Sequence, residues 1–166
     1  EAFKFNQPSD VDHYASLLTA GFERISGALL PHDQIFVDTK FEFGYAKNRD
    51  GVNELIYMDE VGTPDSSRIW DASAYKTGQV VENSKEGFRQ ALLSSAPDPD
   101  VLINENRMDE RYRFASDTVL PARMMLDVSK TYVDLAETIT GAPLALSDSP
   151  RDDIISVLNT TFALIN

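Results

Sequence analysis

Three charged residues spaced two apart, Asp38, Lys40 and Glu42, are the first candidates for chemistry in this sequence. In a β-strand, residues two apart project to the same face, so these side chains would lie together. A second short apolar run ends in the carboxylates Asp59 and Glu60. If the two runs pair, an ammonium and several carboxylates gather on one side and form a site. The alternative is an ordinary solvated hairpin face, which is also polar at alternate positions.

A second candidate follows directly after that run. Asp65, Ser66, Ser67 and Arg68 come after an X-Pro turn and supply a carboxylate, two hydroxyls and a guanidinium. Such a loop can present several hydrogen-bonding groups to a small anion, with Arg68 as a bidentate clamp on a carboxylate or phosphate. The alternative is a solvated turn in which a serine caps a local backbone group.

Both candidates lie in residues 35–70, whose two halves alternate apolar and polar residues around a turn-forming cluster at 48–51. This pattern predicts a β-hairpin. The register is open, because a shift of one residue moves every side chain to the other face. One register pairs Lys40 with Asp59 and Glu42 with Tyr57, which would place the charged residues on one side.

Helical patterns flank the hairpin. Ser9 resembles an N-terminal cap for a helix that ends near residues 30–31, and a short helix is expected over residues 85–95. The remaining patterns are a helix from Pro121 to Gly141, a final helix opened by Ser149-Pro150, a connection at 71–83 and a charged, solvated stretch at 104–113. The apolar stripes of the helices are expected in the core. The fold class is therefore α+β, an antiparallel hairpin or sheet packed with several helices, in a single domain over residues 1–166.

Composition narrows the function. The 166 residues carry a net charge of −12, which argues against binding to nucleic acid or to an anionic membrane. The absence of cysteine excludes disulfides, thiolate catalysis and Cys-ligated zinc, and no apolar run approaches the roughly 20 residues that span a bilayer. A cytoplasmic protein that binds small molecules is expected, and a homo-oligomer stays open. Because the sequence starts without Met, we expect a processed product or an excised piece.

Three longer motifs resemble one family. They read DTKFEFG at 38–44, DEVGTPDSSRIW at 59–70 and LPARMMLDVSKTYVDLAETITG at 120–141, and together they are similar to SAICAR synthetase (phosphoribosylaminoimidazole-succinocarboxamide synthase) of purine biosynthesis. Gly62 and Ile69 are mild departures from its usual pattern. The resemblance implies a ligase that uses ATP to join L-aspartate to the carboxylate of CAIR, giving SAICAR, ADP and phosphate.

The resemblance also implies roles for the site residues. Glu42 and Asp59 would hold Mg²⁺ beside ATP, and Lys40 and Arg68 would act on the substrate carboxylate or the transferring phosphate. The implied substrate-binding residues are Lys40, Asp65, Ser66, Ser67 and Arg68. Asp38 and Glu60 would contact these groups without touching the substrate or the metal ion themselves.

The family begins with a nucleotide-binding lobe that these residues do not include. We therefore expect the C-terminal portion of such an enzyme, inactive or nearly so when alone, because catalysis by positioning needs the whole cleft. Two alternatives stay open: an ATP- and Mg²⁺-dependent kinase of related architecture, and an acidic binding module without catalysis.

Overall fold

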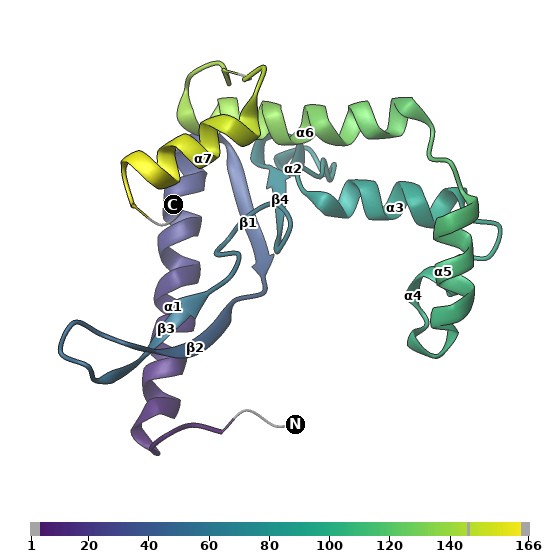
Figure 1. The fold of residues 1–166 in the computed structure, drawn as a ribbon. Coiled ribbons are helices and arrows are strands. Elements are labelled where there is room, and N and C mark those ends of the chain that lie inside the picture. The colour runs from purple at the N-terminus through teal and green to yellow at the C-terminus, as the bar shows by residue number, and fades with distance from the viewer. Residues whose placement is uncertain (1–3, 146, 164–166) are drawn as a thin grey trace.

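Helix α1, Ser9–Leu29, runs along two short antiparallel sheets in the computed structural model (Figure 1), which describes residues 4–145 and 147–163. One sheet pairs β1, Gln34–Thr39, with β4, Ser67–Asp71. The other pairs β2, Glu42–Lys47, with β3, Asn53–Met58. Helices and antiparallel sheets together confirm the α+β class.

The long hairpin expected over residues 35–70 divides into these two sheets. Strand β1 ends at Thr39, and the backbone N–H of Lys40 donates to the carbonyl of Ser66 at 2.9 Å. A new strand then starts at Glu42. Strand β1 at the start of the predicted hairpin is therefore paired with β4 instead of β3, which brings the segments around residues 38 and 68 side by side.

The hairpin of β2 and β3 has a different register from the one that pairs Glu42 with Tyr57. Glu42 lies opposite Met58, and Tyr57 lies opposite Phe43. The loop sets this register, because Asn48 Oδ1 accepts from the backbone N–H groups of residues 50 and 52 at 3.0 Å each. The pairing of Lys40 with Asp59, which belonged to that one of the open registers, is not formed either, since both residues lie outside the strands.

The hairpin packs its aromatic face on α1. Phe43 stacks edge-on against Tyr14 with ring centroids 4.9 Å apart, and the hydroxyl of Tyr57 donates to the backbone carbonyl of Leu17. Tyr45 donates to the buried carboxylate of Asp10 at 2.5 Å. This face fixes the hairpin on the helix, so the opposite face, with Glu42, points away from α1.

The helical predictions hold in outline. Helix α3 spans Lys85–Ser95 and α6 spans Ala122–Thr140, with Gly141 at φ 68° as its C-terminal stop. Ser9 is the first residue of α1 and not its cap, because no side chain caps that helix. The stretch expected as a connection contains a helix, and the charged stretch is helical as well. The other elements are η1 Leu30–His32, α2 Ala72–Lys76, α4 Asp100–Ile103, η2 Glu105–Arg107, α5 Met108–Asp117 and α7 Pro150–Thr160.

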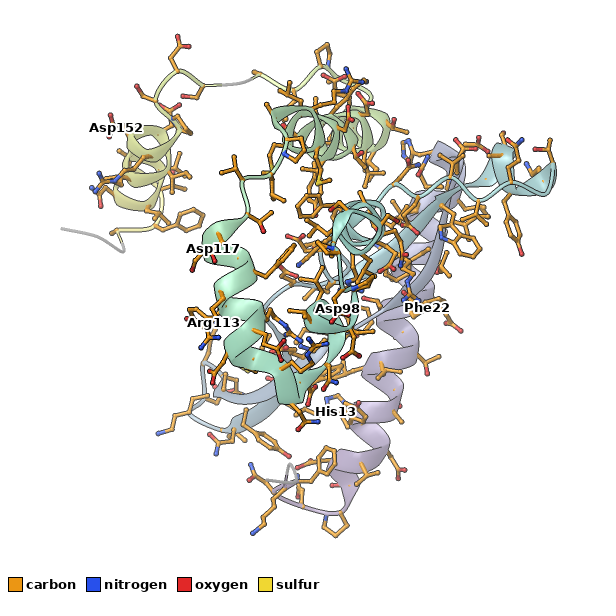
Figure 2. All side chains as sticks on the ribbon, turned by 90° about the vertical axis from the view of Figure 1, so that its right-hand side faces the viewer. His13, Phe22, Asp98, Arg113, Asp117 and Asp152 are labelled. Atoms are coloured by element: carbon orange, nitrogen blue, oxygen red, sulfur yellow. The ribbon has the colours of Figure 1, made fainter. Side chains whose placement is uncertain are left out.

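A small core joins α1, the first sheet and α6. It consists of Leu29, Phe36, Ile69 and Leu135, and Ile69 is only 1% exposed. The expectation that the whole α6 stripe is buried is wrong, because Met125 is 48% exposed. The final helix α7 overlaps α1 in the view of Figure 1. Figure 2, turned by 90°, shows that α7, which carries Asp152, lies apart from α1. Within the described residues, no helix has both the length and the apolar character needed to cross a membrane.

Candidate functional site

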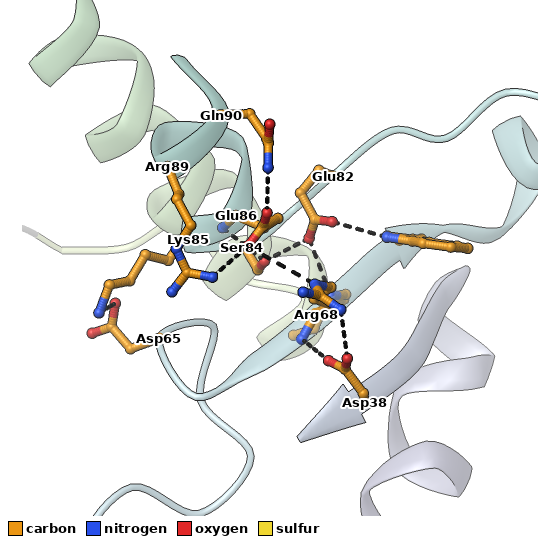
Figure 3. A network of polar contacts seen from close by, with 11 residues as sticks. Asp38, Asp65, Arg68, Glu82, Ser84, Lys85, Glu86, Arg89 and Gln90 are labelled. Atoms are coloured by element: carbon orange, nitrogen blue, oxygen red, sulfur yellow. Dashed lines mark hydrogen bonds and ion pairs between the residues drawn. The ribbon is translucent and has the colours of Figure 1, made fainter. Parts of the chain in front are cut away.

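A β-bulge in β1 places Asp38 opposite Arg68 at the centre of the site. The register of β1 against β4 shifts between Phe36 and Asp38, so that Phe36 pairs with Ile69 in the core while Asp38 pairs with Arg68. The Asp38 carboxylate accepts from the backbone N–H of Arg68 at 3.2 Å and from its Nη1 at 2.7 Å (Figure 3). Asp38 thereby fixes both the backbone and the guanidinium of Arg68.

A cavity of about 250 Å³ opens beside this pair. Three segments line it: residues 38–40 after the bulge, residues 64–68 before and within β4, and residues 84–89 at the start of α3. The lining includes four cations, namely Lys40, Arg68, Lys85 and Arg89. The lining also carries the carboxylates Asp38, Asp65 and Glu86, so four cations against three carboxylates leave a net charge of +1 in a chain whose net charge is −12. This small local excess of positive charge is suited to a small anion.

The first turn of α3 contributes the residues that the sequence analysis missed. Glu86, whose side chain is 17% exposed, binds Arg89 Nη1 at 2.7 Å and lies 3.9 Å from Arg68 Nε. Ser84 caps the helix through Glu86 N–H at 3.3 Å. The cap was a readable signal for the helix start, but a charged first turn looks the same whether it faces solvent or a cavity.

Two serines of the predicted substrate loop differ in exposure. Ser67 is buried, and its hydroxyl lies 2.9 Å from that of Thr39 on the neighbouring strand. Ser66 is half-buried, and its hydroxyl donates to the carbonyl of Thr63 at 3.3 Å. Both residues line the cavity, but Ser67 and Arg68 belong to β4 and not to the preceding loop.

Asp65 reaches the cavity from the loop itself. Its Oδ1 accepts from the hydroxyl of Tyr132 on α6 at 2.5 Å and lies 3.7 Å from Lys85 Nζ. Burial, followed by the hydrogen bond to Asp65, raises the pKa of Tyr132 well above its ordinary value of 10.0. The tyrosine therefore stays protonated and remains a donor at neutral pH.

The remaining carboxylates gather around Lys40 at the edge of the cavity. The ammonium donates to Glu42, and this hydrogen bond and charge raise the pKa of Lys40, with smaller contributions from the charges of Asp59 and Glu60. Asp59 adopts a left-handed conformation with φ 58°, so the chain turns directly after β3. Lys40 and Glu42 are thus in contact and the charge of Asp59 acts on Lys40, but neither carboxylate lines the cavity itself.

The donor set has limited capacity for a metal ion. Over residues 4–145 and 147–163, no group of three or more His, Asp or Glu side chains is arranged to hold one. Mg²⁺ commonly uses only one or two carboxylates when phosphates and waters complete its octahedron. The oxygens of Glu42 and Asp59 suit Mg²⁺ on that condition, so their chemistry fits a metal that arrives with a phosphate ligand.

The sequence of the chain matches one enzyme family. The family model for SAICAR synthetase matches residues 1–101, and the chain belongs to that family. It is 57% identical over 164 residues to the phosphoribosylaminoimidazole-succinocarboxamide synthase of Vibrio cholerae serotype O1, covering 99% of this chain and 45% of that protein. The chain thus spans less than half the length of this curated relative.

Solved structures show the same fold. A SAICAR synthase structure superposes with a TM-score of 0.52 at 23% identity, covering 81% of this chain and 40% of that one. A SAICAR synthase from Saccharomyces cerevisiae, complexed with SAICAR, superposes with a TM-score of 0.50 at 26% identity over 75% of this chain and 36% of that one.

Proposed function

We propose that the complete protein is an ATP-dependent ligase that joins L-aspartate to the carboxylate of CAIR and releases SAICAR, ADP and phosphate. Family membership supports this reaction. The observation that carries the proposal is the cavity where Lys40, Arg68, Lys85 and Arg89 converge in a strongly acidic chain. A substrate with both carboxylate and phosphate groups needs such a surface.

Within this proposal, Arg68 binds the reacting carboxylate. Its guanidinium is already oriented by Asp38 at 2.7 Å, so little side-chain entropy is lost when the substrate arrives. Lys85 and Arg89 would bind a second anionic group from the α3 side of the cavity. The hydroxyls of Ser66 and Ser67 complete the lining between these two ends.

Glu42 and Asp59 would hold Mg²⁺ at the edge of the cavity. The ion, when bound with ATP, neutralises the charge that develops as the γ-phosphoryl group moves to the substrate carboxylate. Lys40 already donates to Glu42. In the loaded enzyme it would turn to the transferring phosphate as a point charge, while the amine of L-aspartate attacks the acyl phosphate.

Residues 1–166 would form one domain that provides one side of the cleft, in a cytoplasmic enzyme. The chain has 12,262 Å² of accessible surface, whereas a compact monomer of 18.5 kDa exposes about 8,200 Å². The excess suggests that further protein covers these elements in the complete enzyme. The 166 residues alone should therefore show almost no turnover.

The test uses the complete enzyme and its Glu42→Gln and Arg68→Lys variants. Phosphate release should require CAIR, ATP, Mg²⁺ and L-aspartate together, and each variant should lose about 10²-fold or more in kcat/KM. Glu54→Gln on the same hairpin and Arg151→Lys on α7 are matched controls that should keep wild-type activity, because neither residue lines the cavity.

The alternatives give different results in the same assay. A kinase would phosphorylate an acceptor at full rate without L-aspartate. A binding module would release no phosphate at all and would tolerate Glu42→Gln. Wild-type activity in both Glu42→Gln and Arg68→Lys would refute the roles proposed for these side chains.

A further inference from the structure

Tyr132 reaches the site from an element far away in sequence. It lies on α6, and its hydroxyl donates to Asp65 Oδ1 across 67 positions of the chain. The same oxygen lies 3.7 Å from Lys85 Nζ. Within the described chain the other oxygen, Oδ2, has no hydrogen-bond partner, although Asp65 lines the cavity. One oxygen of Asp65 is thus held and the other is available.

Tyr132 stands behind Asp65 and does not touch the cavity. A separate shallow hollow of about 300 Å³ is lined by Tyr132, Asp65 and Lys85, while the site cavity is lined by Asp65 and Lys85 without Tyr132. Figure 3 shows the Lys85 amine against Asp65. Any effect of the phenol on a ligand must therefore pass through Asp65.

We propose that Tyr132 is a positioning residue, which holds Asp65 so that Oδ2 accepts a hydrogen bond from an N–H or O–H group of a substrate. This inference rests on the proposed ligase function. Asp65 needs such support because it lies on an exposed loop with a 39% exposed side chain and is free to change rotamer without a partner.

The core supplies the rigidity. Tyr132 is half-buried one turn before Leu135, which is 5% exposed and belongs to the core cluster with Ile69 of β4. Strand β4 carries Arg68, so the same cluster supports both ends of the cavity. The core thereby fixes the spacing between the anion clamp and the carboxylate.

The chemistry of the cavity defines the group that Asp65 receives. The neighbouring cations bind anionic groups, but an ionised carboxylate only accepts hydrogen bonds. Its partner must be a donor: the ammonium of L-aspartate, or a hydroxyl or amino group of the ribotide. The two sources are separated by the substrate whose KM changes.

The experiment compares Tyr132→Phe with wild type in the complete enzyme. The phenyl ring is kept and only the hydroxyl is lost, so Tm should change little. KM for one substrate should rise about five- to twentyfold, equivalent to about 1–1.8 kcal/mol at about 1.4 kcal/mol per tenfold change, with kcat less affected. An increase for L-aspartate identifies its ammonium, and an increase for CAIR identifies a hydroxyl or amino group of the ribotide. Tyr112→Phe is the matched control, because Tyr112 is 74% exposed on α5.

A double-mutant cycle tests whether Tyr132 acts through Asp65. Asp65→Asn should affect the same KM, and adding Tyr132→Phe to Asp65→Asn should change it by less than about twofold. Independent, additive effects would overturn the inference, as would wild-type kinetics for Tyr132→Phe or an equal rise in every KM. If wild-type enzyme turns over with L-aspartate and Tyr132→Phe is unaltered, only this inference fails. If wild-type enzyme shows no such turnover, the proposed function fails and this inference with it.

Discussion

Replacing Ile69 by Ala tests whether the small core supports the site. Ile69 is 1% exposed and follows Arg68 on β4. The substitution removes three buried carbons, worth about 0.8 kcal/mol each in transfer free energy, and the cavity left behind brings the expected loss to about 3–4 kcal/mol. Ile69→Val, which removes one carbon, should cost only about 0.5–1.5 kcal/mol.

Denaturant unfolding followed by circular dichroism measures these losses. Ile154→Ala is the matched control, since Ile154 is 60% exposed on α7 and should change the free energy of unfolding by less than about 0.5 kcal/mol. The decisive comparison is the order of the free energies of unfolding at position 69, which should be lowest for Ala, intermediate for Val and highest for wild type. Equal stability of Ile69→Ala and Ile154→Ala would refute the reasoning that this cluster is the core of the chain.

Three further predictions address other parts of the chain. The hydrogen bond from Tyr45 lowers the pKa of Asp10 below 3.8, so the ionised Asp10 stabilises the folded state fully above that pH, and this stabilisation is lost as the pH falls through the lowered pKa. Urea unfolding at falling pH should therefore show a weaker acid dependence of the free energy of unfolding for Asp10→Asn than for wild type. Gly62→Ala should lower Tm in a thermal scan, because φ is 71° there and an added Cβ would collide with Ile25 Cδ1. Arg107→Lys should accelerate proteolysis at the α4–α5 corner, because lysine cannot keep the guanidinium contacts to three carboxylates there; an unchanged cleavage rate would contradict this.

Local signals in the sequence were sufficient for α3 and for the end of α6. The 85–95 helix was predicted at its observed bounds, because Phe88 and Leu92 fall at helical spacing and Pro97 follows its end. Gly141 ended the 122–140 helix as expected, since a left-handed residue at that position favours glycine. Such signals act within a few residues and do not require knowledge of the rest of the fold.

Strand partners could not be predicted in the same way. Alternation shows that residues 34–39 form a strand but not that they pair with β4 instead of β3, because that choice depends on packing against α1. The hairpin register was set by the Asn48 side chain, which closes the loop through two backbone N–H groups. Lys85 and Arg89 escaped notice for a related reason: only tertiary structure shows that their helix turn faces a cavity.

Under the proposed function, the pairing of each cation in the cavity would explain how an acidic protein binds anionic substrates selectively. Lys40, Arg68, Lys85 and Arg89 are four of the fifteen basic residues of the chain, and each lies within 4 Å of a carboxylate. These pairs hold the cations in place before a substrate arrives, which favours precise geometry over raw affinity. Charges beyond about 8 Å are largely screened at physiological ionic strength, so the net negative surface repels large polyanions without weakening the contacts inside the cavity. A small substrate that satisfies several cations at once can therefore displace the carboxylates, whereas a single isolated anion cannot.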